Sequence, residues 1–420
     1  MKIEAKDAGK GEFIVKNKQL FSDLSAFELS YAFAADGEVF ASGKIPESDF
    51  ADLAPLSQRE FSLELPEFPA GEIVLTFSFT GKEKTRFSEA GFEQAWDQFV
   101  LREAEAPDET KPEGKVEIIG SEDEFKVTGD GFEYKFVKGL PVSLMKDGKE
   151  YLKDALRPNF YRALTDNDID YLNFAPPMIP LHPLYMWNRS TKGAKTKAAF
   201  VHKYRSSAYI ETRVSALGIK DALMTFTVDA KGKLIVDFKA TASTDNMLRF
   251  GVSMQLEKSF DGVKWYGRGP QETYCDRKSG AKIGLFEMSV ADLEHHYMRP
   301  QENGNRVDCR RLEITDGDKT IDFIALNKSR SDADASDALR FERAVGSSRS
   351  FGFEAHHYTT ASLDKAEHIQ ELEDEWLTEL CIDCMQRGVG GDMPGSATLR
   401  EPYIMHKGVT FGLRFALELK

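Results

Sequence analysis

The sequence predicts an all-β protein built from a small antiparallel sandwich and a much larger second one. Two observations carry this prediction. Runs of alternating apolar and polar residues, the period of a strand with one buried face, recur along the whole chain. One polar stretch with two prolines, residues 104–114, interrupts them. We therefore expect a first domain at 1–103, a linker at 104–114 and a second domain at 115–420.

The first domain contains a strong hairpin signal. FELSYAF at 27–33 alternates, Asp36-Gly37 follows, and VFASG comes next. Alternating residues around Asp-Gly are typical of a β-hairpin. IVLTFSF at 73–79 repeats the pattern and should bury Ile73, Leu75, Phe77 and Phe79. The stretch SEAGFEQAWDQFV, 88–100, is helical by composition but fits a strand equally well.

Strand signals continue through the second domain. MTFTVDAKGKLIVDFKA, 224–240, reads as two strands about a Lys-Gly turn, and FGLRFALELK, 411–420, alternates to the last residue. We expect this last strand to close a sheet. Helix signals are few, and SLDKAEHIQ, 362–370, predicts a short helix with Ser362 as its N-cap. Some 300 residues of strands without strand–helix alternation indicate a large sandwich.

Composition excludes several functional classes. The chain has 55 basic and 69 acidic residues and a net charge of −14, so it should repel nucleic acid and anionic membranes. No apolar run approaches the roughly 20 residues that span a bilayer, and the first residues hold no apolar signal segment. We expect a cytoplasmic protein. Cys381 and Cys384 form a C-x-x-C, but on a strand their sulfurs face opposite ways, which favours ordinary strand residues over a metal or redox pair.

The segment LTDNDID, 164–170, gathers three aspartates at alternate positions. A calcium loop of this register would need glycine at its sixth position and an acidic residue at its twelfth, where Tyr171 and Pro177 stand. A calcium site is therefore excluded. Asx turns and a binding loop both remain open for this segment.

Acidic and histidine side chains offer a second candidate chemistry. Glu272, Glu302 and the adjacent pairs His295-His296 and His356-His357 could combine as an acid and a base. Neighbouring residues of a strand face opposite ways, so neither histidine pair should chelate one ion. With 69 acidic residues, counting alone identifies no catalytic pair.

Four segments resemble the signatures of one enzyme family. WYGRGPQETYCDRKSG resembles the W-x-G-x-GP-x-E-x-Y-x-DR block of the C-terminal domain of bacterial β-galactosidases of glycoside hydrolase family 2. The other three follow that family in order and spacing, and the first domain is similar to the immunoglobulin-like domain just after its catalytic barrel. The four segments span 160–169, 265–280, 299–314 and 385–392.

The resemblance implies both a fold and a division of labour. Residues 1–103 would form an immunoglobulin-like sandwich, and residues 115–420 the supersandwich also seen in galactose mutarotases. In the family an earlier barrel carries the catalytic glutamates and binds magnesium and sodium. This chain would then hold no catalytic residue and no cofactor of its own. Its partners would be that barrel and a β-galactoside, within an enzyme that we expect to be oligomeric.

The resemblance also implies which loops border the substrate. Loops 164–172 and 388–396 would form part of the rim of the barrel's pocket, with Asn167, Asp168, Asp392 and Gly395 as rim residues. Enteric members place a tryptophan near Gly395 that stacks on the non-galactose part of the substrate. Its absence here leaves lactose preference open.

Two other functions remain open. The chain could be a stand-alone sugar epimerase that uses Glu302 with His357 or His356 as acid and base. Alternatively it could be a carbohydrate-binding or assembly module with no part in an active site, because a fold does not fix a function.

Overall fold

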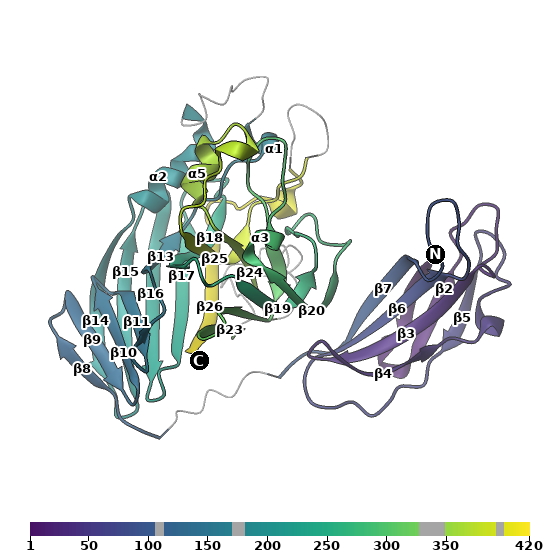
Figure 1. The fold of residues 1–420 in the computed structure, drawn as a ribbon, viewed down its shortest axis with the longest axis horizontal. Helices are drawn as coiled ribbons and strands as arrows, with labels where there is room; N and C mark the ends of the chain where they lie inside the picture. The colour runs from purple at the N-terminus through teal and green to yellow at the C-terminus, as the bar shows by residue number, and fades with distance from the viewer. Residues whose placement is uncertain (106–112, 170–180, 327–348, 392–398) are drawn as a thin grey trace. The chain divides into compact units, whose positions relative to one another are not determined.

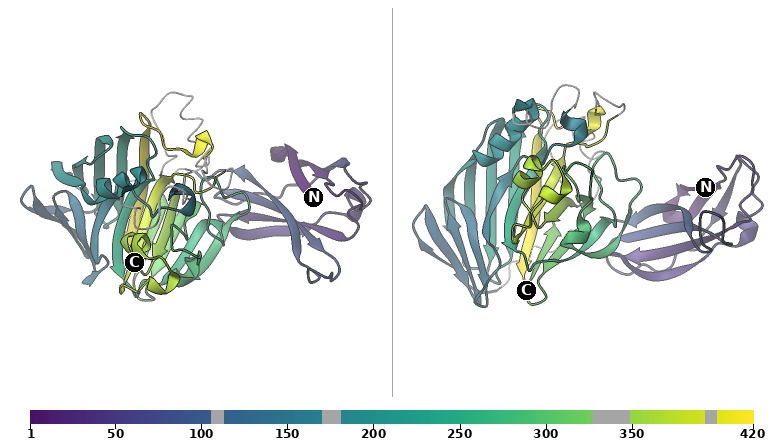
Figure 2. Two further views of the ribbon diagram at one scale, coloured as in Figure 1. Left: turned by 90° about the horizontal axis from the view of Figure 1, so that it is seen from above. Right: turned by 45° about the horizontal axis from the view of Figure 1, so that its top comes forward.

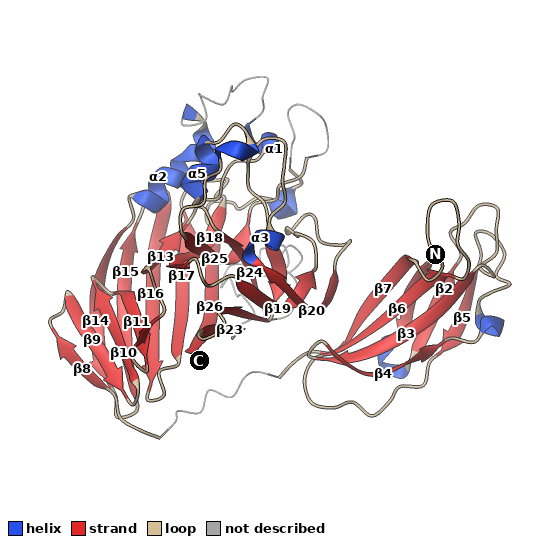
Figure 3. Ribbon diagram, in the orientation of Figure 1, coloured by secondary structure: helices blue, strands red, loops and turns tan. Residues whose placement is uncertain are grey.

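The protein is all-β, with strands in every sheet antiparallel where their pairing is resolved (Figure 3). The computed structural model describes residues 1–105, 113–169, 181–326, 349–391 and 399–420. The chain separates into two compact units. The first contains Met1–Ala106 with Ile283–Leu285, and the second contains Pro107–Lys282 with Phe286–Lys420. Most of the stretch predicted as a linker lies outside the described residues.

The first unit is a sandwich of two sheets. One sheet has the order β1-β2-β5 and the other has the order β4-β3-β6-β7. The strands are β1 (Lys2–Asp7), β2 (Glu12–Lys16), β3 (Phe27–Ala35), β4 (Glu38–Lys44), β5 (Gln58–Ser62), β6 (Ile73–Gly81) and β7 (Glu93–Arg102).

Apolar residues of both sheets share one core in this unit. Phe13 of β2 meets Phe77 of β6 edge-on, with ring centroids 4.9 Å apart, a favourable aromatic geometry. The prediction for β6 is confirmed, since its four alternate apolar residues are all buried. Asp36 and Gly37 make the predicted hairpin turn with φ of 46° and 89°, as a two-residue turn of this type requires. The ambiguous segment 88–100 contributes strand β7 and no helix.

The second unit contains three sheets, two of five strands and one of nine. Their orders are β12-β11-β10-β9-β8, β13-β18-β25-β24-β21 and β14-β15-β16-β17-β26-β23-β22-β19-β20. The first half of the strands is β8 (Glu117–Gly120), β9 (Glu124–Gly129), β10 (Phe132–Val137), β11 (Leu140–Lys146), β12 (Lys149–Glu150), β13 (Asp154–Asn159), β14 (Lys195–Lys203), β15 (Ser207–Ser215), β16 (Ile219–Asp229) and β17 (Leu234–Ala242). The second half is β18 (Arg249–Glu257), β19 (Gly262–Gly269), β20 (Lys282–Ser289), β21 (Arg306–Cys309), β22 (Arg311–Thr315), β23 (Thr320–Ala325), β24 (Phe351–His356), β25 (Leu377–Gln386) and β26 (Thr410–Leu419).

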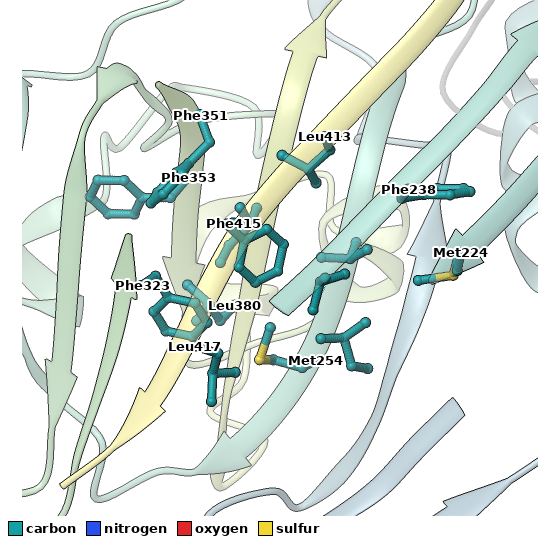
Figure 4. Close-up of a cluster of buried hydrophobic side chains, with 14 of the residues drawn as sticks. Met224, Phe238, Met254, Phe323, Phe351, Phe353, Leu380, Leu413, Phe415 and Leu417 are labelled. Atoms are coloured by element: carbon teal, nitrogen blue, oxygen red, sulfur yellow. The ribbon is translucent and has the colours of Figure 1, made fainter. Parts of the chain in front are cut away.

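The last strand, β26, lies inside the nine-stranded sheet. It pairs with β17 on one side and with β23 on the other. The expectation that it closes a sheet is therefore wrong: it joins two halves of one sheet. Its alternate residues are buried as predicted, and Figure 4 shows Phe415 and Leu417 among core side chains that include Leu380 of β25 and Met254 of β18.

Helices are short and gather at one end of the second unit. Figures 1 and 2 show α1 (Asp166–Ile169), α2 (Met186–Lys192) and α5 (Thr360–Lys365) at this end of the strands. A fourth helix, α3 (Val290–Leu293), packs beside β24. The predicted helix near Ser362 is present as α5, but its N-cap is Thr359. Single 3₁₀ turns span Ala8–Lys10, Glu47–Asp49, Pro183–Tyr185, Ile369–Glu371 and Glu401–Tyr403.

The C-x-x-C residues belong to β25, where Cys381 and Cys384 are both buried and unbridged. Within the described ranges, no group of three or more histidine, cysteine, aspartate or glutamate side chains could hold a metal ion. Nor is any helix of the described segments long and apolar enough to cross a membrane.

Candidate functional site

Residues from all four signature segments, or directly beside them, meet around one cavity of about 90 Å³. They come from the turn before and within α1, the loop after β19, the segment after α3 and the loop after β25, which are far apart in sequence. The lining residues are Thr165, Asn167, Tyr274, Arg277, Tyr297, Gln301, Glu302 and Val389.

The first wall is a single helical turn held by a reciprocal cap. The carboxylate of Asp168 accepts hydrogen bonds from both the backbone N–H and the hydroxyl of Thr165, at 2.9 Å each. This arrangement resembles a capping box, with Thr165 at the N-cap and an acidic residue three positions later. The T-x-x-D spacing is visible in the sequence, and a search for caps would have found it.

Asp168 also lies between two arginines. Its carboxylate is 2.6 Å from Nη1 of Arg162, whose side chain is fully buried, and it forms a second, shorter contact with Arg387. Burial by itself raises the pKa of Asp168, but these two guanidinium groups outweigh it and lower that pKa below its usual value. Asp168 is therefore ionised, enclosed and fully engaged, so its part in a rim would be to hold the loop.

Asn167 lies beside Asp168 but faces outward. Its side-chain amide donates a 2.7 Å hydrogen bond to the carbonyl of Val389, in the other predicted rim loop. Asn167 thus joins the first rim loop to the second at Val389, and Asp168 joins it to Arg387, the residue just before the second loop. Asp392 and Gly395, the other two predicted rim residues, lie outside the described residues.

The opposite wall is a group of three polar side chains. The carboxylate of Glu272 contacts both the Arg277 guanidinium and the Tyr297 hydroxyl, and it accepts a 2.8 Å hydrogen bond from the backbone N–H of Gly304. Arg277 also donates to the Tyr297 hydroxyl at 3.0 Å. These contacts neutralise Arg277 and fix its position at the cavity.

The floor leads into a buried cluster of three carboxyl groups around one guanidinium. Arg249 of β18 lies 2.6 Å from Glu354 of β24, 3.0 Å from Asp383 of β25 and 3.4 Å from Glu302. All four side chains are at least 96% buried. One positive charge cannot balance three negative ones in such surroundings, so the carboxyl groups must differ in protonation.

The pKa values of the three carboxyl groups separate accordingly. Burial, and then the charge of Glu354, raise the pKa of Glu302 well above its usual value. Burial also raises the pKa of Asp383 to about 7. For Glu354 the Arg249 charge and a hydrogen bond from Glu302 overcome burial and lower the pKa to about 2. Glu354 is therefore an anion at neutral pH, and the raised pKa of Glu302 favours its protonated form.

Comparison with known proteins identifies the family. The model of the beta-galactosidase small chain matches residues 128–417, and the model of beta-galactosidase domain 4 matches residues 13–102. The chain belongs to the beta-galactosidase small chain family. The resemblance carried by the four sequence segments is confirmed.

Curated relatives of this chain are beta-galactosidases of greater length. The chain is 27% identical to the Priestia megaterium protein over 100% of itself and 38% of that protein. It is 29% identical to the Lactobacillus delbrueckii subsp. bulgaricus protein over 93% of itself and 36% of that protein. The chain therefore spans less than two-fifths of each of these relatives.

Solved structures with a similar chain course include the galactose 1-epimerase of Lactobacillus acidophilus. It is 8% identical, with a TM-score of 0.42, over 73% of this small chain and 99% of that one. A putative aldose 1-epimerase of Escherichia coli is 9% identical, with a TM-score of 0.32.

Glu302 and His357, the alternative acid–base pair, contact different groups in this chain. Nε2 of His357 is 3.0 Å from Asp261 and Nδ1 is 3.1 Å from the carbonyl of Leu377, whereas Glu302 belongs to the Arg249 cluster. His356 is buried, which lowers its pKa, and its Nε2 contacts the carbonyl of Asn303. Neither histidine makes a described hydrogen bond to Glu302.

Gly388 and Gly390 allow the Asp276 carboxylate to lie close to the backbone of the loop after β25. A Cβ at Gly388 would lie 2.5 Å from a carboxylate oxygen of Asp276, and the backbone N–H of Gly390 donates a 2.8 Å hydrogen bond to that carboxylate. Neither glycine has a positive φ. At both positions the contact with Asp276 gives the reason for the missing side chain.

Proposed function

We propose that this chain is a non-catalytic C-terminal portion of a retaining β-galactosidase, in which it forms part of the wall around an active site carried by a separate barrel. The family assignment and the beta-galactosidases among its relatives support this proposal. So does its length, since those relatives have more than half of their chain outside the matched region.

The observation that carries the proposal is the convergence of the four signature segments on one cavity edge. Two of them contain the first residues of the loops expected at the rim, and these two segments are tied together by Asn167 and by Asp168. A wall of this kind orients a substrate and excludes water from the reacting groups, which raises their effective concentration.

The carboxyl groups near the cavity support an accessory role rather than a hydrolytic one. A retaining glycosidase places two carboxyl groups about 5–5.5 Å apart on either side of the scissile bond. Glu302, Glu354 and Asp383 instead surround Arg249 and are withdrawn from solvent. The general acid, the nucleophile and the magnesium and sodium ions would belong to the barrel.

A chromogenic β-galactoside tests this division of labour. We expect no turnover by the pure chain and turnover when it is combined with a barrel-bearing β-galactosidase portion, or when it replaces the matching region of the Priestia megaterium enzyme. Robust turnover by the chain alone would contradict the proposal.

A matched pair of variants tests the wall itself. Asn167→Ala removes the amide that reaches Val389, and we expect a lower kcat/KM in the assembled enzyme. Gln271→Ala is the control, since its amide also donates to a backbone carbonyl, that of Gly280 at 2.9 Å, but Gln271 does not line the cavity. An equal loss of kcat/KM in Asn167→Ala and Gln271→Ala would argue against a role for the wall in substrate binding.

A further inference from the structure

We propose that the 90 Å³ cavity is itself a binding subsite for the hydroxyl groups of a neutral sugar, with the Tyr274 hydroxyl and the Glu302 carboxyl as its recognition groups. The choice of a sugar as ligand class rests on the proposed function. The existence of the subsite rests on the geometry of the cavity.

The first observation is an unused polar atom. Tyr274 is 1% exposed, yet its hydroxyl has no hydrogen-bond partner among the described residues. Buried hydroxyls are normally paired, because an unpaired one forfeits the hydrogen bonds that it makes with water. The backbone fixes its position, since Tyr274 and Arg277 exchange hydrogen bonds of 3.2 and 2.9 Å. An atom held there without a partner is available to a ligand.

The second observation is that the neighbouring lining groups are already engaged. Tyr297 and Arg277 both contact Glu272. Thr165 is bonded to Asp168, and the Gln301 side chain accepts from the backbone of Asp166 and donates to the carbonyl of Arg299. Among these lining groups, the Tyr274 hydroxyl has no partner, and Glu302, which is bonded to Arg249 and Glu354, keeps acceptor capacity on its carboxyl oxygens.

The third observation is charge balance, which selects a neutral ligand. Burial and the adjacent Glu354 raise the pKa of Glu302, and its proton is shared with Glu354, so toward a ligand Glu302 offers an acceptor oxygen that complements the Tyr274 hydroxyl donor. Arg277 is paired with Glu272. Without an unpaired charge, the cavity would gain little from an anion or a cation, whereas hydroxyl groups match both recognition groups.

Size agrees with this class of ligand. One water needs a cavity of about 10–15 Å³, and this cavity measures about 90 Å³. It can therefore accept one edge of a sugar ring.

Ligand-detected NMR titration of the full 420-residue chain with D-galactose tests the subsite. We expect weak, saturable binding. Tyr274→Phe keeps the ring and removes only the hydroxyl, so it should weaken binding about three- to tenfold, the value of one neutral hydrogen bond. Tyr134→Phe is the control: its hydroxyl is also buried but donates to the carbonyl of Gly232, away from the cavity, and it should leave the affinity unchanged.

Two results would overturn the subsite: a titration that does not saturate, or an affinity that is the same in Tyr274→Phe and in the unaltered chain. Either could occur while the chain still supports turnover with a barrel partner, and the proposed function would then stand without the subsite. Conversely, saturable binding that depends on Tyr274, together with no turnover in the assembled enzyme, would keep the subsite and refute the proposed function.

Discussion

Asp168 and Arg162 form an ion pair 2.6 Å long in which the side chains are 1% and 0% exposed. They lie six residues apart, and the intervening chain makes the turn into α1. Because Arg387 approaches the same carboxylate from the end of β25, one buried anion holds together two loops of the proposed wall. Stability and wall geometry should therefore depend on it jointly.

Replacing the Asp168 carboxylate should lower the stability of the second unit. Asp168→Asn leaves two guanidinium groups near an uncharged amide, and we expect the second unit to lose about 3–5 kcal/mol of unfolding free energy. Urea unfolding followed by circular dichroism measures the loss, and the transition of the first unit serves as an internal reference.

The matched control is Asp154→Asn. Asp154 also pairs with an arginine, Arg157 at 2.8 Å, but both side chains are about half exposed, and such pairs contribute about 0–1 kcal/mol. If the two variants lose similar amounts of unfolding free energy, the buried pair of Asp168 and Arg162 does not hold the two loops together.

Gly388 should tolerate no side chain. In Gly388→Ala the new methyl would lie 2.5 Å from the Asp276 carboxylate, so the loop or Asp276 must move, at about 1–3 kcal/mol. Gly280→Ala is the control, because nothing lies within 4 Å of its added Cβ and its φ is not positive. Thermal unfolding should separate the two, and a Gly388→Ala variant as stable as Gly280→Ala would contradict the close approach.

Local patterns predicted the parts of the fold that depend on neighbours in sequence. The buried residues of β6 follow from a period of two, and the Asp36-Gly37 turn follows from which residues accept positive φ. The place of β26 could not be derived in this way, because it depends on pairing with β17 and β23, some 170 and 95 residues earlier.

In the candidate site, too, the sequence predicted individual residues but not their distant partners. The family resemblance pointed to Asn167 and Asp168, the search for an acid and a base pointed to Glu302, and the T-x-x-D cap was readable from sequence. However, the partners that decide what these residues do are distant: Arg387 is 219 residues from Asp168, and Arg249 is 53 residues from Glu302. Tyr274 was visible within a signature, but nothing local shows that its hydroxyl is unpaired.

Loss of the hydroxyl should lower the free energy of unfolding at one buried tyrosine and leave it almost unchanged at another. Tyr134→Phe removes a donor to the Gly232 carbonyl at 2.5 Å and leaves that carbonyl unpaired, at about 1–2 kcal/mol. Tyr274→Phe removes a hydroxyl without a described partner, so stability should change by less than about 0.5 kcal/mol. Urea denaturation of both variants without sugar measures this difference. A large loss in Tyr274→Phe would show that its hydroxyl has a structural partner.

Asp383 should make the second unit less stable as pH rises. Its pKa is about 7 in the folded protein against a reference of 3.8, so between these values the unfolded chain is ionised while the folded protein keeps its proton. Raising the pH through this window therefore favours unfolding. Asp383→Asn cannot titrate, so its unfolding free energy relative to the unaltered chain should increase by about 2 kcal/mol from pH 5 to pH 7.

Glu354→Gln supplies the contrast, because Glu354 pairs with the same Arg249 but has a pKa lowered from 4.5 to about 2. The stability that this carboxylate contributes is lost only as pH falls through that range, so it is fully present from pH 5 upward. Glu354→Gln should therefore be destabilised by about 3 kcal/mol or more at pH 5. Because the Glu354 charge also raises the pKa of Asp383, its loss should weaken the pH dependence that Asp383 confers. Urea unfolding at several pH values compares the two slopes. A flat difference between Asp383→Asn and the unaltered chain from pH 5 to pH 7 would contradict the placing of a proton on Asp383.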